Sequence, residues 1–304
     1  MLQIKTILKK ILKNSYLFLL LTLLTGKIIL FLSELLTLFY EELIFKFFPK
    51  TDWMILLVEL SSFIFITGLV VFWGRKIQKL SWETFGFMRK NALKHFLKGW
   101  LLGGIVLSLC VILMIFLGAV KIDGIQISPQ LICRFFFLFF AWSIQGNAEE
   151  VLTRGWLFGG ISKKINIFIG ILISSSFFTW MHLENDGISL LSLLDLFLFG
   201  IFAVLYRIKT ENIWGISGFH AAWNCFQGNV FSFPVSGTDT GSAFISVTTQ
   251  GPSWLSGGKF GVEGSIVSIV VQLILIFYLY YEIFIKGKKN MRDQFVPEKF
   301  EPNE

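Results

Sequence analysis

The fold of this chain is decided by Leu131–Phe158, which reads LICRFFFLFFAWSIQGNAEEVLTRGWLF. Its length and apolar character are those of a helix that crosses a bilayer. Two adjacent carboxylates, Glu149 and Glu150, nevertheless lie in its second half together with Arg154. A carboxylate in hydrocarbon costs about 3 kcal/mol or more unless a partner compensates it. We therefore interpret the two glutamates as residues of a site inside the membrane.

The composition is that of an integral membrane protein. Of the 304 residues, 54% are hydrophobic and only 15% are charged, whereas soluble domains carry about 25% charged residues. The partner is therefore the lipid bilayer, and we expect a multi-pass protein of the cell membrane. No cleavable signal is predicted, because the first apolar run is too long for one. Cys110, Cys133 and Cys225 lie in apolar segments without paired spacing, which predicts small core residues and no disulfide frame or metal site.

Apolar stretches of about 20 residues predict an all-α, polytopic membrane helix bundle with about eight transmembrane helices. The expected spans are Ser15–Phe39, Trp53–Trp73, Gly99–Ala119, Leu131–Phe158, Ile165–Leu183, Ile188–Tyr206, Ile213–Phe233 and Gly264–Ile285. With eight spans and both termini inside, the outer loops contain only four Lys or Arg residues, which are Lys46, Lys50, Lys121 and Lys259. The positive-inside rule therefore predicts N-in and C-in. The net charge of +7 then follows from topology, and no nucleic-acid partner is expected.

Two loops have a distinct character. The basic stretch Leu80–Lys98 is partly amphipathic and is expected to lie along the inner interface. Ser236–Gly264 is rich in Gly, Ser and Thr, which is compatible either with a turn-rich cap over the bundle or with a solvated loop. Scattered ionisable residues within spans are expected to be pairings at helix interfaces, namely Lys27, Glu34, Glu59 and Asp195.

Polar residues of the middle spans fall on helical faces. Glu150 and Arg154 are four residues apart and can form an ion pair, whereas Glu149 points about 100° away and is free for another task. His182 ends a polar stripe of the fifth span, and His220 and Asn224 share a face of the seventh. A lone intramembrane histidine is often an interhelical hydrogen-bonding residue. Lys163-Lys164 lies midway between Glu149 and His182 in sequence, so an antiparallel pair of helices would bring these two to a similar depth.

The three motifs Glu149-Glu150-x-x-x-Arg154, Phe178-x-x-x-His182 and His220-x-x-x-Asn224 together resemble the signature of the CPBP family of intramembrane proteases. That family comprises type II CAAX prenyl endopeptidases, lysostaphin-resistance-like proteins and bacteriocin-processing or immunity proteins. The resemblance covers Glu149–Asn224 without departure at a motif position. It divides the chain into N-terminal spans and an interfacial basic loop (1–130), a catalytic core (131–285) and a cytoplasmic tail (286–304).

The resemblance implies an endopeptidase that hydrolyses a peptide bond with activated water, and a peptide or membrane-protein segment as its substrate. By that resemblance Glu149 and His182 would activate the water, and His220 and Asn224 would donate hydrogen bonds to the oxyanion. Glu150 and Arg154 would orient and support the site, and Phe178 would pack the cavity wall. The residues alone do not assign which histidine performs which role, and they leave the substrate, the oligomeric state and the side to which the site opens undecided.

Alternatives to this interpretation remain at the level of sequence. No cofactor is expected, but Glu149, His182 and His220 could in principle form a three-ligand zinc site, although no HExxH motif is present. A non-catalytic scaffold or immunity-type protein of the same fold is the main alternative function. A transporter is a further alternative, but no inverted repeat or pair of broken helices is visible.

Overall fold

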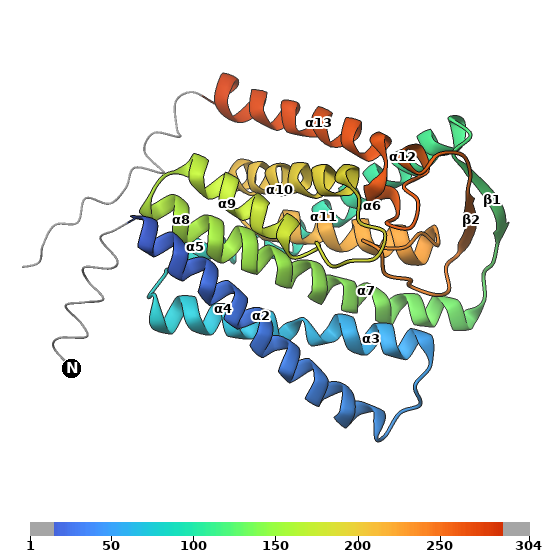
Figure 1. Ribbon diagram of the computed structural model, residues 1–304, viewed down its shortest axis with the longest axis horizontal. Helices are drawn as coiled ribbons and strands as arrows, with labels where there is room; N and C mark the ends of the chain where they lie inside the picture. Colours follow the sequence, from blue (N-terminus) through green and yellow to red (C-terminus); the bar gives the residue numbers. More distant parts are fainter. Residues whose placement is uncertain (1–14, 288–304) are drawn as a thin grey trace, which may run out of the picture.

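The computed structural model describes residues 15–287, and within them the chain is a bundle of long apolar helices (Figure 1). Six helical segments are long and apolar enough to cross a membrane. They are α2 (Ser15–Phe45), α3 to η1 (Asp52–Ile77), α6 (Ala92–Phe116), α7 to α8 (Pro129–Lys164), α10 (Leu190–Thr210) and α13 to η5 (Ile266–Lys286). The prediction of an all-α, polytopic bundle is therefore confirmed.

Two further helices occupy the remaining expected spans. The helix α9 (Ile167–Trp180) has 14 residues and α11 (Trp214–Cys225) has 12, with the π-helical segment η3 (Phe226–Val230) after it. Both helices are shorter than the roughly 20 residues that cross a bilayer. A helix therefore lies in each of the eight expected ranges, but a count of eight membrane crossings stays a prediction.

The ends of several helices follow from capping residues in the sequence. Ser128 accepts a hydrogen bond from the backbone N–H of Leu131 at 3.2 Å, and Pro129 is the first residue of α7. Asn166 and Ser189 cap α9 and α10 in the same way. A side-chain oxygen at these positions satisfies a backbone donor that the first helical turn leaves unpaired. The turns on either side of α9 are therefore encoded locally.

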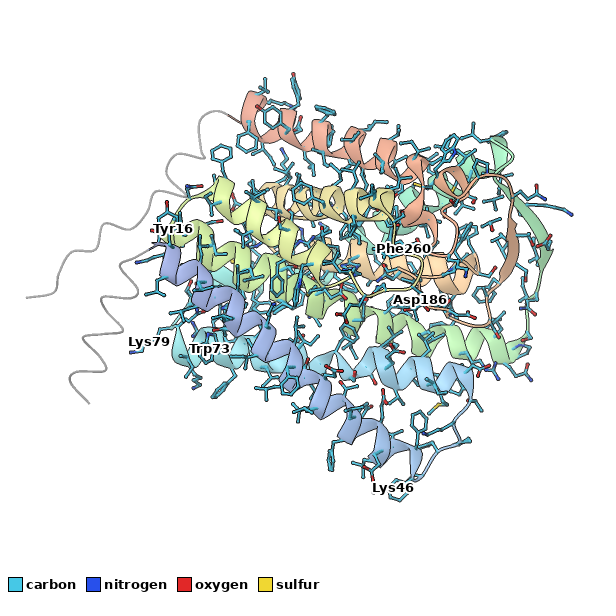
Figure 2. The ribbon with its side chains drawn as sticks, viewed as in Figure 1. Tyr16, Lys46, Trp73, Lys79, Asp186 and Phe260 are labelled. Carbon is cyan, nitrogen blue, oxygen red and sulfur yellow. The ribbon has the colours of Figure 1, made fainter. Side chains whose placement is uncertain are left out.

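The segments predicted to be inside gather at one end of the bundle. Figure 1 shows the start of α2, the helix α8 and the end of α13 at this end, and Figure 2 shows Tyr16 and Lys79 there, far from Lys46. Lys209 of α10 forms an ion pair with Glu282 of η5 (Tyr281–Lys286) at 2.9 Å. The common end is a structural fact, whereas its assignment to the inner side, with both termini inside, stays a prediction.

Small residues bring α11 to the centre of the bundle. A Cβ on Gly99 of α6 would lie 1.8 Å from the carbonyl oxygen of Gly215. A Cβ on Gly103 would lie 2.3 Å from the carbonyl oxygen of Phe219. Gly146 of α7 is similarly close to Ala221, at 2.9 Å from its nitrogen. Such close approach of helix backbones is typical of packing in membranes, where small residues replace the hydrophobic effect as the basis of association. The helix that carries His220 and Asn224 is thereby held between α6 and α7.

The loops differ in part from what the sequence predicts. The basic stretch Leu80–Lys98 contains the short helix α5 (Trp82–Phe85), but from Ala92 onward it is already the first turns of α6. The glycine-rich segment 236–264 contains β2 (Ile245–Thr249), α12 (Ser253–Ser256) and η4 (Val262–Gly264). It covers the bundle as a cap, because Phe260 and Val262 are buried and Glu263 accepts a hydrogen bond from Trp223 of α11. Its strand β2 pairs antiparallel with β1 (Val120–Ile125), a small sheet that was not predicted.

Two further predictions need correction. Cys110 and Cys225 are buried and free, but Cys133 is exposed, because it lies on the outer face of α7. The core position predicted for Cys133 is therefore wrong. Glu34 of α2 and Glu59 of α3 (Asp52–Ser62) line a cavity, where pairings at helix interfaces were expected. Lys27 does contact a neighbouring helix, because its ammonium lies 4.7 Å from the ring centroid of Trp180.

Candidate active site

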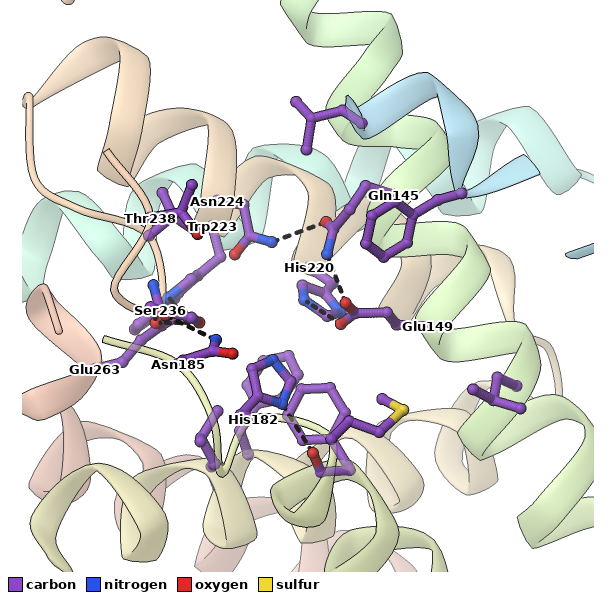
Figure 3. A pocket seen from close by; sticks show the side chains of 18 of the residues that line it. Gln145, Glu149, His182, Asn185, His220, Trp223, Asn224, Ser236, Thr238 and Glu263 are labelled. Atoms are coloured by element: carbon purple, nitrogen blue, oxygen red, sulfur yellow. Dashed lines mark hydrogen bonds and ion pairs between the residues drawn. The ribbon is translucent and has the colours of Figure 1, made fainter. Parts of the chain in front are cut away.

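The residues of the three motifs converge from three parts of the chain. Glu149 ends α7 together with Glu150, His182 lies in the turn just after α9, and His220 and Asn224 are one turn apart on α11. Glu149, His182, His220 and Asn224 all line one cavity of about 530 Å³. Figure 3 shows the side chains of Glu149, His182 and His220 directed toward this common space. The antiparallel arrangement of α7–α8 and α9 thus brings Glu149 and His182 to the same cavity.

A chain of amide hydrogen bonds fixes one oxygen of Glu149. Gln145 Nε2 donates to Glu149 Oε1 at 2.7 Å, and Asn224 Nδ2 donates to Gln145 Oε1 at 3.0 Å. The carboxylate only accepts, so it determines the orientation of both amides. Glu149 Oε2 has no hydrogen-bond partner and lies 3.6 Å from His220 Nε2. One oxygen of Glu149 is therefore held in place while the other faces the cavity and the imidazole.

Glu150 lies behind His220 and is fully buried. Its Oε1 accepts hydrogen bonds from Arg154 Nη1 at 3.1 Å and from His220 Nδ1 at 2.9 Å. The expected ion pair with Arg154 is therefore present, and Glu150 additionally orients the imidazole that approaches Glu149. Because Nδ1 donates to Glu150, the Nε2 atom is the one that faces Glu149 and the cavity. The two adjacent glutamates thus lie on either side of the His220 ring, and each has a further partner of its own, Gln145 for Glu149 and Arg154 for Glu150.

His182 is held by the helix from which it emerges. Its Nδ1 lies 2.8 Å from the carbonyl oxygen of Phe178. A carbonyl only accepts, so Nδ1 carries the proton and Nε2 keeps a lone pair. The ring of Phe178 contacts His182 at 4.8 Å and His220 at 5.9 Å between centroids, and the guanidinium of Arg154 lies 4.4 Å from it. Phe178 therefore forms the wall between the two imidazoles and the buried ion pair.

Directly after Glu150 the chain continues as the π-helical segment η2 (Val151–Phe158), a feature that the sequence did not predict. The wider turn is followed without interruption by α8 (Gly159–Lys164). Its altered hydrogen bonding is compensated by other elements, because Ser174 Oγ donates to the carbonyl oxygen of Thr153 at 2.9 Å, and Arg207 Nη1 donates to that of Arg154. π-helical turns often occur at functional sites. Here the wide turn contains Arg154, the partner of Glu150.

The roof of the cavity is formed by residues that the motifs do not include. Glu263 Oε1 accepts from Trp223 Nε1 at 3.1 Å, and its Oε2 accepts from the backbone N–H and the hydroxyl of Ser236 at 2.9 and 2.7 Å. Asn185 Nδ2 in turn donates to the carbonyl oxygen of Ser236 at 2.8 Å. Burial raises the pKa of Glu263 above its ordinary value, against the opposite effect of the Ser236 hydrogen bonds. The glycine-rich segment contains two carboxylates, Asp239 and Glu263, and no motif in the sequence distinguishes Glu263 from Asp239.

The zinc alternative concerns Glu149, His182 and His220. Among residues 15–287, no group of three or more His, Cys, Asp or Glu side chains is arranged to hold a metal ion. Glu149, His182 and His220 line the same cavity, but His182 Nδ1 bonds to a carbonyl, and both nitrogens of His220 lie near carboxylate oxygens. Histidines that ligate a metal often make such a bond with the ring nitrogen that faces away from the metal, so the absence of a resident metal stays a prediction.

Comparison with known families gives a match at the same residues. The family model described as type II CAAX prenyl endopeptidase, Rce1-like, matches residues 129–226. This segment runs from the start of α7 to the end of α11 and contains all three motifs. Neither curated proteins nor solved structures gave a match. Residues 129–226 are therefore similar to the Rce1-like type II CAAX prenyl endopeptidases, in agreement with the CPBP resemblance of the three motifs, and they lie within a multi-pass membrane protein.

Proposed function

We propose that this chain is an intramembrane endopeptidase that hydrolyses a peptide bond of a peptide or membrane-protein substrate with water activated by Glu149. The observation that carries the proposal is the common cavity of Glu149, His182, His220 and Asn224, in which Glu149 Oε2 is buried without a partner. A buried acceptor of this kind lies ready to bind and deprotonate a water molecule. The Rce1-like domain supports a CAAX-protease-like activity at the level of the family.

The roles follow from the hydrogen bonds of each side chain. Glu149 Oε2 takes one proton from the attacking water, and the free Nε2 of His182 accepts a hydrogen bond from the other O–H, which stays on the water oxygen. Water oxygen then forms a bond to the carbonyl carbon of the peptide, and the proton passes to the leaving amine as the C–N bond breaks. The second N–H of Asn224 donates to the oxyanion, and His220 donates to it from Nε2 as the imidazolium, whose Nδ1–H remains bonded to Glu150. Glu150 and Arg154 act as positioning residues, since they reach the reaction only through His220.

The proposed chemistry uses no resident metal or cofactor. It is tested by assaying purified protein after exhaustive treatment with a chelator. Undiminished activity is expected, and activity that disappears and returns with added Zn²⁺ would replace the glutamate mechanism by a metal-dependent one.

The central experiment compares the peptide ends of the membrane proteome, by mass spectrometry, between cells with the wild-type protein and cells with Glu149→Gln. Glutamine keeps the bond from Gln145, because its amide oxygen still accepts, but it cannot take a proton. We expect the loss of a defined set of new peptide ends, with kcat reduced by about 100-fold or more and unchanged protein level. The same ends in both cells would refute the proposal. Complementation of a cellular phenotype by Glu149→Gln would favour the scaffold alternative.

A further inference from the structure

The cavity of the candidate active site is strongly acidic. Among the described residues, it is lined by six carboxylic side chains and by no Lys or Arg; the six are Glu34, Glu59, Glu149, Glu184, Asp195 and Glu263. In a medium of low dielectric such a wall creates a negative potential that attracts cations. Acidic residues alone do not define a binding site. The hydrogen-bond partners of each buried carboxylate show whether it has a structural role or can bind a ligand.

Outside the catalytic motifs, Asp195 and Gln272 are adjoining side chains of the cavity wall that each have an unpaired acceptor. Asp195 of α10 and Gln272 of α13 (Ile266–Tyr280) are 1% and 2% exposed and line the cavity. Gln272 Nε2 donates to Asp195 Oδ2 at 2.9 Å and to Ser268 Oγ at 3.2 Å. The amide nitrogen must face the carboxylate, because the opposite orientation would place two acceptors against each other. Asp195 Oδ1 and Gln272 Oε1 are therefore buried acceptors without a partner.

Glu263, the third buried carboxylate of this wall beside Glu149 and Asp195, has no unpaired oxygen. Both oxygens of Glu263 accept hydrogen bonds, from Trp223 and from Ser236, so Glu263 has a structural role in the roof. Unpaired buried acceptors are rare in folded proteins and call for a donor. Two acceptors on adjoining side chains, one of them a carboxylate, suit a cation with several N–H groups, as an ammonium or guanidinium has.

The position of Asp195 relates it to the reacting groups. Asp195 precedes Phe199 by one turn of α10, and the ring of Phe199 contacts that of His220 at 5.0 Å between centroids. One turn of helix is about 5.4 Å, a distance that the four-carbon stem of Lys or the longer arm of Arg can span. A peptide whose scissile bond lies between Glu149 and His220 can therefore direct a basic side chain at Asp195.

We propose that Asp195 and Gln272 form a specificity subsite that binds a Lys or Arg side chain of the substrate next to the scissile bond. The inference rests on the proposed endopeptidase activity and adds the substrate class: peptide segments with a basic residue at one fixed position. The two free oxygens receive N–H donors from the cation, whose charge compensates the acidic wall. A neutral side chain would leave both acceptors without partners, which is the basis of discrimination.

The cleavage test uses the peptide ends that depend on Glu149. Lys or Arg is expected at one fixed position relative to these ends. For a synthetic peptide that spans one such site, replacing the basic residue by Gln should lower kcat/KM by about 10- to 100-fold. Asp195→Asn should abolish this preference, Asp195→Glu should retain it in part, and the charge-matched control Glu184→Gln should keep it. Two results would overturn the subsite. One is a set of Glu149-dependent peptide ends without Lys or Arg at a fixed position, and the other is a preference for Lys or Arg that survives in Asp195→Asn.

A binding test does not depend on catalysis. The melting temperature of the detergent-solubilised protein is measured with n-butylguanidinium and with its neutral analogue n-butylurea. Stabilisation by the guanidinium alone is expected in the wild type and in Glu149→Gln, and it should be absent in Asp195→Asn. Equal responses of wild type and Asp195→Asn, or stabilisation by K⁺ or Mg²⁺ in place of the guanidinium, would refute the subsite.

The two proposals fail in different ways. Identical peptide ends in wild-type and Glu149→Gln cells would remove the endopeptidase and, with it, the substrate inference. Ends that depend on Glu149 but show no basic residue would leave the endopeptidase intact and remove only the subsite.

Discussion

At the scale of single residues, Glu149 and Glu150 differ because they occupy different faces of one helix. Glu150 is bonded by Arg154 and His220 and does not line the cavity, whereas Glu149 lines it and is bonded by Gln145. Two like carboxylates in such different surroundings acquire different tasks. The buried ion pair is needed because removal of one partner leaves the other charge uncompensated in a medium where it is poorly solvated.

Arg154→Met tests the dependence of the fold on this pair. The change leaves Glu150 buried with a single donor, so we expect the free energy of unfolding to fall by about 3–5 kcal/mol. The measurement is thermal or denaturant unfolding in detergent. Lys286→Met serves as control, because the ion pair of Lys286 with Glu282 is exposed and screened by solvent. Similar losses in both variants would contradict the structural role of Arg154.

At the scale of elements, the site depends on how closely α11 approaches its neighbours. Gly103 of α6 lies against the backbone of Phe219, the residue before His220. A side chain at this position would push α11 away from α6 and displace His220 relative to Glu149 on α7. The same close approach explains why so short a helix can lie in the centre of the bundle.

Gly103→Ala is expected to reduce stability by about 1–3 kcal/mol, the usual range for overpacking, and to reduce cleavage more than tenfold. Its Cβ would lie 2.3 Å from the carbonyl oxygen of Phe219, which no side-chain rearrangement can relieve. Gly68→Ala in α4 (Ile64–Phe72) is the matched control, since a Cβ there meets nothing within 4 Å. Unfolding and activity are measured for both. Wild-type behaviour of Gly103→Ala would show that α6 and α11 are further apart.

The cap formed by residues 236–264 should give the fold a dependence on pH. Burial raises the pKa of Glu263 above its ordinary value of 4.5. A carboxyl group with a raised pKa in the folded state contributes stability that is fully present below the ordinary value and is lost as the pH rises through the raised value. The melting temperature of the wild type should therefore decline over this window relative to that of Glu263→Gln. Parallel pH profiles of the two proteins would exclude a titrating Glu263.

At the scale of the whole molecule, the asymmetry of cations along the bundle predicts its orientation. The segments rich in Lys and Arg meet at one end of the structure (Figures 1 and 2). Because the cytoplasmic side of membrane proteins is enriched in such residues, this end is predicted to face the inside.

The orientation is tested with single cysteines in a Cys133→Ser background, since Cys133 is the exposed native cysteine among the described residues. A membrane-impermeant maleimide applied to intact cells should label Lys46→Cys and leave Lys79→Cys unlabelled until the membrane is opened. The two positions lie at opposite ends of the bundle (Figure 2). The reverse pattern would overturn the N-in, C-in orientation. Labelling of both cysteines in intact cells would contradict the placement of Lys46 and Lys79 on opposite sides of the membrane.

Features that depend on neighbours in sequence could be predicted well. The spacing of Glu150 and Arg154 predicted their ion pair, because residues that are four positions apart lie on the same face of a helix. The caps Ser128, Asn166 and Ser189 act on backbone groups only a few residues away. The apolar spans follow from solvation in lipid alone, which is why the class of the fold was predicted while the small sheet of β1 and β2 was not.

The sequence by itself determined a membrane-embedded helix bundle and the identity of the motif residues, because periodicity and transfer into lipid are local properties. Only the tertiary structure decided that His220 Nδ1 binds Glu150 and that Glu263 holds the roof. It also decided that Asp195, Glu34 and Glu59 belong to the same cavity as Glu149. These relations join residues from separate helices and loops. Their geometry follows from how closely the helices pack, and no spacing along the chain encodes it.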